Sequence, residues 1–241
     1  MTGAVNVMGL CAFSFSIVIA ADTTNYNWTT ALTGLGWDGI TPVVGTLTIN
    51  TGVYVYATST GNYGLTQGGA FPSGSVPTLS VLGSIHGQGG AGGAGGSFAV
   101  GANGSPGGPA LLLQSAIIIT GNGSIFGGGG GGGGAGANNT PGPGGAGGGG
   151  GAGKSPGAGG AGGNNGTPGN PGNTGGTTTG GTGGSLWGTG GNGGNSGASG
   201  TAGSNDIHNG GTGGANGLGV QGYSLGDWSG FSGTILGGTA G

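Results

Sequence analysis

Charge is nearly absent from this chain of 241 residues. It has one lysine, no arginine and four acidic residues, for a formal net charge of −3 at pH 7. Proteins that bind nucleic acid need basic patches to neutralise phosphates, so nucleic acid is excluded as a partner. Disordered chains are normally rich in charge. Only 2% of these residues are charged, which argues against a soluble coil.

Residues that carry chemistry are also scarce, with one cysteine and two histidines. The single Cys11 excludes an internal disulfide. The histidines and aspartates have no spacing typical of a zinc or iron site, and no serine or cysteine lies in a recognisable nucleophile setting. We therefore expect no metal, no cofactor and no enzymatic activity.

Glycine is abundant instead, at 79 of 241 residues. From Gly87 to Gly222 it recurs largely as Gly-Gly-x, and Gly127–Gly134 is unbroken. A polyproline-II helix has three residues per turn, so this pattern leaves two faces of such a helix bare. Neighbouring chains can then approach closely enough to pair their backbone groups. The sequence favours a stack of polyglycine-II helices over a disordered linker.

Turn-forming residues interrupt the glycine runs at intervals of about ten residues, or ~30 Å of polyproline-II chain. Asn, Pro, Thr and Ser favour turns, so we expect the chain to reverse at these breaks and the resulting loops to lie at the ends of the stack. The breaks are residues 138–141, 154–156, 164–171, 177–179, 185–187 and 204–209.

Outside the glycine runs, apolar segments predict a small β core and one short helix. Asn27 is expected to cap a helix within Asn25–Gly39, with Gly34 as its left-handed C-terminal residue. Val43–Asn50 and Val53–Ala57 alternate about a turn, which predicts a hairpin.

A pentapeptide repeat, Gly-[Ser/Thr]-Ile-x-Gly, occurs at 83–87, 123–127 and 233–237. Each copy ends an apolar strand, so we expect the three strands to lie side by side and to hold both ends of the glycine lattice. The expected fold class is mostly irregular and β: a small β-strand core, a packed polyglycine-II helix sandwich and one short N-terminal helix.

Composition divides the chain into four segments. Residues 1–24 are an apolar attachment segment, and 25–86 are β-rich with the short helix. Residues 87–222 are the glycine lattice with variable loops and a strand at 109–126, and 223–241 form a C-terminal strand. In the first segment Phe13–Ile17 alternates with period two, which predicts a half-buried strand. A membrane-seeking segment and a docking surface stay open for residues 1–20.

Several other residues are expected to be structural. His86 follows a repeat strand, and Gly148–Ser155 matches a phosphate loop only formally, because no strand precedes it and proline follows. Three aspartates are expected to cap or turn the backbone: Asp22, Asp38 and Asp227. Three aromatic residues are expected in the core: Tyr223, Trp228 and Phe231.

One part of the chain resembles a known family. Tyr26–Gly39, followed by Pro42–Leu65 and Phe71–Gly93, resembles the glycine-rich receptor-binding module of tailed-phage tail fibres and tail tips. Gly107–Ala110 and Gly123–Gly134 continue the likeness. The segment is similar to the adhesins that cap T-even-type long tail fibres, in which glycine-rich segments alternate with variable ones.

The resemblance implies a virion adhesin whose rigid lattice presents variable loops to a host cell-surface protein or glycan. The N-terminal segment would bind other tail or fibre proteins, and the protein would sit at a tail fibre or tail tip. A homo-oligomer such as a trimer and a monomeric cap both stay open. The expected receptor-binding residues are Asn138, Asn139, Thr140, Trp187, Asp206 and His208. Trp187 is the expected anchor, because little core is available around it.

Two other classes of protein stay open. One is a secreted or cell-surface structural protein, a glycine-rich component of a filament or wall. The other is an ice-binding protein, for which Thr177–Thr179 and flat packing are the only hints. The adhesin is favoured because its resemblance rests on the non-repetitive Tyr26–Leu65 as well as on glycine.

Overall fold

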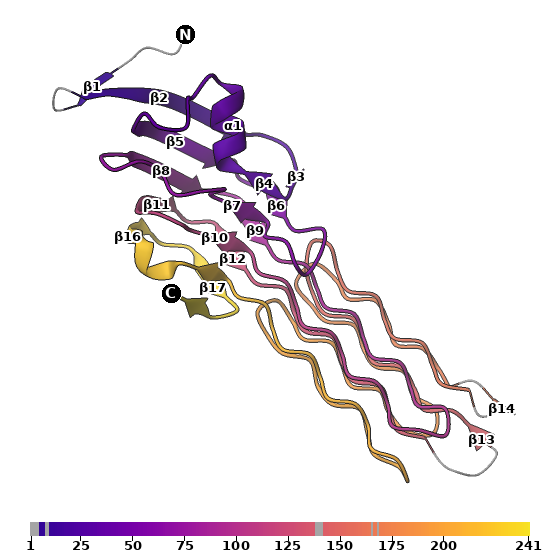
Figure 1. The fold of residues 1–241 in the computed structure, drawn as a ribbon. Helices are drawn as coiled ribbons and strands as arrows, with labels where there is room; N and C mark the ends of the chain where they lie inside the picture. Colours follow the sequence, from indigo (N-terminus) through magenta and orange to yellow (C-terminus); the bar gives the residue numbers. More distant parts are fainter. Residues whose placement is uncertain (1–4, 8–9, 138–141, 165, 168) are drawn as a thin grey trace.

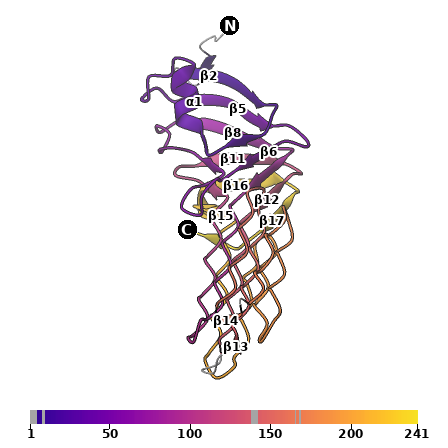
Figure 2. The ribbon, with the colours of Figure 1, turned by 90° about the vertical axis from the view of Figure 1, so that its right-hand side faces the viewer.

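The computed structural model describes residues 5–7, 10–137, 142–164, 166–167 and 169–241. Three β-sheets lie at one end of the molecule, and long glycine-rich segments run side by side away from them (Figures 1 and 2). The fold is mostly β, and the described residues contain one α-helix.

The chain winds through the three sheets in turn, so that each coil contributes one strand to each sheet. The strand orders are β1-β2-β5-β8-β11-β16, β17-β12-β9-β6-β3 and β18-β15-β10-β7-β4. Neighbouring strands in these sheets are parallel, except β1 with β2. The result is a three-sided parallel coil with the apolar core inside it.

The first sheet contains β1 (Val5–Val7), β2 (Leu10–Ile19), β5 (Val43–Ile49), β8 (Val76–Val81), β11 (Ile117–Gly121) and β16 (Gly226–Phe231). The second contains β3 (Thr23–Thr24), β6 (Tyr54–Tyr56), β9 (Ser84–His86), β12 (Ser124–Phe126) and β17 (Thr234–Leu236). The third contains β4 (Tyr26–Asn27), β7 (Leu65–Thr66), β10 (Leu111–Leu112), β15 (Val220–Gln221) and β18 (Thr239–Ala240). A separate pair joins β13 (Gly142–Pro143) and β14 (Gly166–Thr167).

The three pentapeptide repeats lie side by side, as the sequence predicts. They form β9, β12 and β17, with β12 in the middle and Ile125 aligned with Ile85 and Ile235. Ile85 and Ile125 are fully buried, because alternate residues of a strand face the same side of its sheet.

The predicted hairpin of residues 43–50 and 53–57 is wrong. These residues form β5 and β6, which belong to different sheets. β5 pairs instead with β2 and β8, so Val44 aligns with Ser14 and with Val76. The alternation in these residues correctly predicts two strands, but the strands that pair with each of them belong to the preceding and following coils.

The helix α1 (Trp28–Gly34) is capped as predicted, since the Asn27 side chain accepts from the Thr30 N–H at 3.0 Å. It is shorter than the expected Asn25–Gly39. The prediction for Gly34 is wrong, because the left-handed residue is Gly36, with φ of 96°. Trp28 and Leu32 are buried, so this face of the helix covers the core.

The expected strand at 109–126 divides into β10, β11 and β12, one in each sheet. The half-buried strand expected at Phe13–Ile17 is present within β2. Trp228 and Phe231 pack against the core as expected. Tyr223 is 37% exposed and stacks on Trp228 with ring centroids 4.7 Å apart, so its assignment to the core is wrong.

The glycine segments leave the coil at two corners, after β9 and after β12, and each excursion returns to the third sheet. Their hydrogen bonds repeat every third residue. The N–H groups of Gly89, Gly92 and Gly95 donate to the carbonyls of Ser155, Ala158 and Ala161 at 2.9–3.0 Å. Neighbouring segments are thus joined backbone to backbone over most of their length.

The unbroken run Gly127–Gly134 occupies the centre of this lattice. Gly128, Gly129 and Gly130 donate to Gly108, Ala152 and Ala198, which lie on three different segments, and the same rotation repeats three residues later. A Cβ on any residue of the run would lie within 2.1 Å of a neighbouring carbonyl oxygen. A segment surrounded on every face has no edge for a side chain, which explains why this run of eight residues contains only glycine.

Candidate functional site

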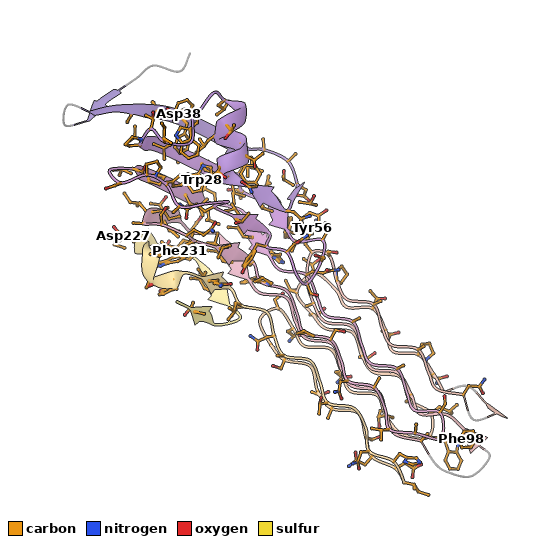
Figure 3. All side chains as sticks on the ribbon, viewed as in Figure 1. Trp28, Asp38, Tyr56, Phe98, Asp227 and Phe231 are labelled. Atoms are coloured by element: carbon orange, nitrogen blue, oxygen red, sulfur yellow. The ribbon has the colours of Figure 1, made fainter. Side chains whose placement is uncertain are left out.

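The turns between glycine segments fall into two groups. The turns at Lys154, Thr177–Thr179 and Asn195–Gly197 lie at the sheet end: Lys154 pairs with Asp22, and Gly197 donates to the Gly127 carbonyl. The turns at 97–100, 185–188 and 205–208 lie at the opposite end, where Figure 3 places Phe98. We call these last three turns the distal turns.

Backbone contacts gather the distal turns around the end of the central segment. Ala137 donates to the Ala99 carbonyl at 3.2 Å and accepts from the His208 N–H at 3.3 Å. Ser204 donates to the Thr189 carbonyl and accepts from Gly136. Residues more than 100 positions apart in the sequence therefore share one surface.

Large apolar side chains are exposed on the distal turns, far from the core. Trp187 is 59% exposed, and four other apolar side chains of the distal turns are exposed to a similar degree. The set is Phe98, Val100, Leu186, Trp187 and Ile207, all between 40% and 60% exposed. An apolar surface of this kind, held on a polar scaffold, is typical of a protein-binding site.

Phe98 and Trp187 adopt left-handed backbone conformations, with φ of 53° and 49°. Only one other non-glycine residue in the described chain, Asn25, has a positive φ. A bulky residue in this region costs of order 1 kcal/mol or more, and such strain clusters at ligand-binding sites. Both aromatic rings are thus displayed on strained turns where glycine would fit better.

The polar residues predicted for binding lie partly on the same surface. Asp206 is exposed, His208 is half-buried, and the Asp206 N–H donates to the His208 carbonyl at 3.0 Å. Asn138, Asn139 and Thr140 lie outside the described residues. The prediction missed Phe98, Val100 and Ile207, although Ser97–Val100 breaks the glycine period as clearly as the later breaks do.

The formal phosphate-loop match has a structural explanation. Gly148–Gly153 belongs to an extended glycine segment, and Lys154 contacts Asp22 at 3.0 Å instead of facing an anion site.

The expected roles of two other aspartates are confirmed: Asp38 accepts from the N–H groups of Ile40 and Thr41, and Asp227 accepts from that of Ser229. The Thr41 hydroxyl and then these two N–H groups keep the pKa of Asp38 below its ordinary value, and the Ser229 N–H does the same for the pKa of Asp227.

The described residues contain no group of three metal-ligating side chains. A cavity of about 310 Å³ lies where β8, β11 and β16 begin, and Asp227 is its only titratable lining residue. Among the helices of the described chain, none has the length and apolar character that a membrane span requires.

A family model for the phage tail fibre adhesin Gp38 matches residues 14–240. The chain belongs to this family. It is therefore a tail fibre adhesin, a virion protein with a receptor-binding role, as the sequence resemblance implies. No curated protein matches the chain.

The adhesin's fold is also similar to a solved structure, the gp37-gp38 adhesin tip complex of the bacteriophage S16 long tail fibre. The TM-score is 0.58 and the sequence identity is 24%. The match covers 96% of this chain and 82% of the other. The likeness supports the coiled sheets with glycine excursions as the fold of the adhesin.

Proposed function

We propose that the distal turns form the surface with which this adhesin binds a host cell-surface protein or glycan. The observation that carries the proposal is the cluster of exposed apolar side chains, with Phe98 and Trp187 held in strained conformations. Desolvated aromatic residues commonly dominate binding energy. Asp206 and His208 lie beside them, and Asn138, Asn139 and Thr140 belong to the proposed surface on sequence grounds.

The glycine segments are, in this proposal, polyglycine-II helices. The three-residue hydrogen-bond period supports this, because polyproline-II helices have three residues per turn and make no internal hydrogen bonds. A lattice tied through its backbone lets loop residues vary without disturbing the scaffold. It also lowers the ordering cost of binding, since the loops start from a rigid frame.

We also assign attachment to the fibre to segment 1–24, whose described strands β1 and β2 belong to the first sheet, at the end of the molecule opposite the distal turns. β1 is the edge of the first sheet, so an N-terminal surface is available for pairing. The similar solved structure is a complex of gp37 with gp38, and by analogy we assign a tail fibre protein as the partner here. A monomeric cap and a homo-oligomer such as a trimer both fit this arrangement. The protein acts by binding and not as an enzyme.

The test compares turns at the two ends of one lattice. In one variant, 97–100, 185–188 and 205–208 are replaced by glycine and serine. In the control, only Thr177–Thr179 at the sheet end are replaced. We expect the purified distal variant to lose competition with phage for host cells by at least tenfold, while the control competes like wild type. Equal competition by folded distal and control variants would refute the assignment.

A further inference from the structure

The single lysine of a sequence without arginine joins the glycine lattice to the sheets. Lys154 lies in the turn between two glycine segments, and its Nζ is 3.0 Å from Asp22 Oδ2. The same Nζ lies 4.1 Å from the centre of the Tyr54 ring, a cation–π contact. Asp22 also accepts from the Tyr54 N–H at 2.9 Å, so the three residues hold one another in place.

His86 lies directly beneath this contact, as the last residue before the first glycine excursion. Its ring meets Tyr54 and Phe126 edge to face, with centroids 5.3 and 5.2 Å apart. The side chain is 1% exposed, and its Nδ1 is buried without a hydrogen-bond partner. The Ser155 carbonyl accepts from Gly89, which binds the Lys154 turn to the strand end that His86 terminates.

This environment opposes a proton on His86. Burial, and secondarily the charge of Lys154, lowers its pKa to about 4. The groups that face it are the rings of Tyr54 and Phe126 and the ammonium of Lys154, with the Asp22 carboxylate beyond the lysine. An imidazolium here is a buried cation without a carboxylate of its own, next to the half-buried Lys154, so water must reach Nδ1 before it can be protonated.

We propose that the Lys154 turn is a latch that fastens the glycine lattice to the sheets and that acid releases when His86 takes up a proton. The turn contacts Tyr54, which packs on the imidazole, and does not belong to the sheets, so lifting it exposes this site to water with the least disruption. Protonation then repels Lys154 from Tyr54, and Asp22 alone retains it. The distal turns and the central glycine run lie beyond this contact and stay intact.

Residue-resolved amide exchange of the full chain tests the latch. Between pH 7 and pH 4, after correction for intrinsic rates, we expect the Gly89 amide to exchange at least tenfold faster. The amide of Gly132, which donates to Gly149 in the middle of the lattice, is the internal control and stays protected. In His86→Phe, which keeps the ring stack and removes the titration, Gly89 stays protected at pH 4.

Direct titration of the wild-type His86 ring provides a readout that needs no variant. Its NMR midpoint is expected to coincide with the shift of the Gly89 amide, and Lys154→Met is expected to move that midpoint upward by removing a nearby cation. The latch is overturned if Gly89 and Gly132 open together. It is equally overturned if Gly89 still opens in His86→Phe, or if Gly89 and the His86 ring titrate with different midpoints.

Discussion

A Cβ atom on Gly131 would lie 1.9 Å from the carbonyl oxygen of Ala91 on the neighbouring segment. This separation is far below any van der Waals contact, and neither atom can rotate away, because the backbone fixes the position of a Cβ and the carbonyl belongs to the backbone itself. The two segments must part if Gly131 carries any side chain. Residues 40 positions apart in the sequence can thus approach this closely only because Gly131 has no Cβ atom.

Gly131→Ala is therefore expected to destabilise the adhesin by several kcal/mol. The displaced segment strands the Gly131 N–H, which donates to Ser105, and the Gly131 carbonyl, which accepts from Gly214, at about 1–3 kcal/mol each. The melting temperature should fall by roughly 10 °C. Gly61→Ala is the matched control, because a Cβ there meets nothing within 4 Å. Equal melting temperatures for the two variants would show that the central run is loosely packed.

The Trp187 turn is expected to matter for binding and not for folding. Replacing Ser185-Leu186-Trp187 by Gly-Gly-Ser removes exposed side chains and leaves a non-glycine residue at the left-handed position 187, so the melting temperature should change little. Loss of an aromatic anchor commonly costs about 2 kcal/mol or more, or roughly thirtyfold in adsorption to host cells. If the swap unfolds the protein, Trp187 has a structural role that its exposure does not indicate.

Phe98 offers a sharper separation of stability from binding. Phe98→Gly should raise unfolding stability by about 1 kcal/mol, because glycine adopts the φ of 53° without strain. The same change should weaken adsorption, since the exposed ring is lost. Phe98→Ala is the control: it loses the ring and keeps the strain. Melting curves and adsorption rates are measured in parallel, and a Phe98→Gly variant that adsorbs normally would remove Phe98 from the site.

Acid should destabilise the folded chain through His86 before its aspartates are protonated. The ordinary His pKa of 6.5 applies to the unfolded chain, whereas the folded value is about 4. As the pH falls from 6.5 to 4, the unfolded state binds the proton and the native state does not, so stability declines by about 3 kcal/mol. Above pH 6.5 His86 is neutral in both states, so it no longer lowers the free energy of unfolding. Chemical unfolding at stepped pH should show this slope in wild type and a much shallower one in His86→Phe, where only the aspartates contribute as the pH nears 4.

Some of this structure could be predicted because its determinants are local. The pentapeptide repeat carries its own register, since the same isoleucine must face the core in each coil, and β9, β12 and β17 align accordingly. The Asn27 cap is likewise a short-range effect. The breaks at 154–156, 177–179, 185–187 and 204–209 do mark turns at the two ends of the lattice.

The coil itself could not be read from local alternation. A strand such as β5 looks the same whether its partner is four residues away across a turn or about thirty residues away in the next coil. The glycine excursions then separate successive coils further, so Thr78 aligns with Ile118. Which turns point away from the sheets also depends on how often the chain has reversed, and Lys154 and Trp187 fall at opposite ends for that reason alone.

The two corners from which the glycine segments leave the coil have a consequence for reach. Each excursion begins at the end of one strand of the coil and ends at the start of the next, β9 to β10 and β12 to β15. The sheets therefore place no constraint on the length of the chain between these strands. Backbone pairing repeats every third residue, and a segment can change length only by whole triplets without losing register with its neighbours. At about 3.1 Å per residue of the proposed polyglycine-II helices, a triplet added to every segment would carry the distal turns about 9 Å farther from the sheets. The length of the glycine lattice can therefore vary only in discrete increments of one triplet per segment.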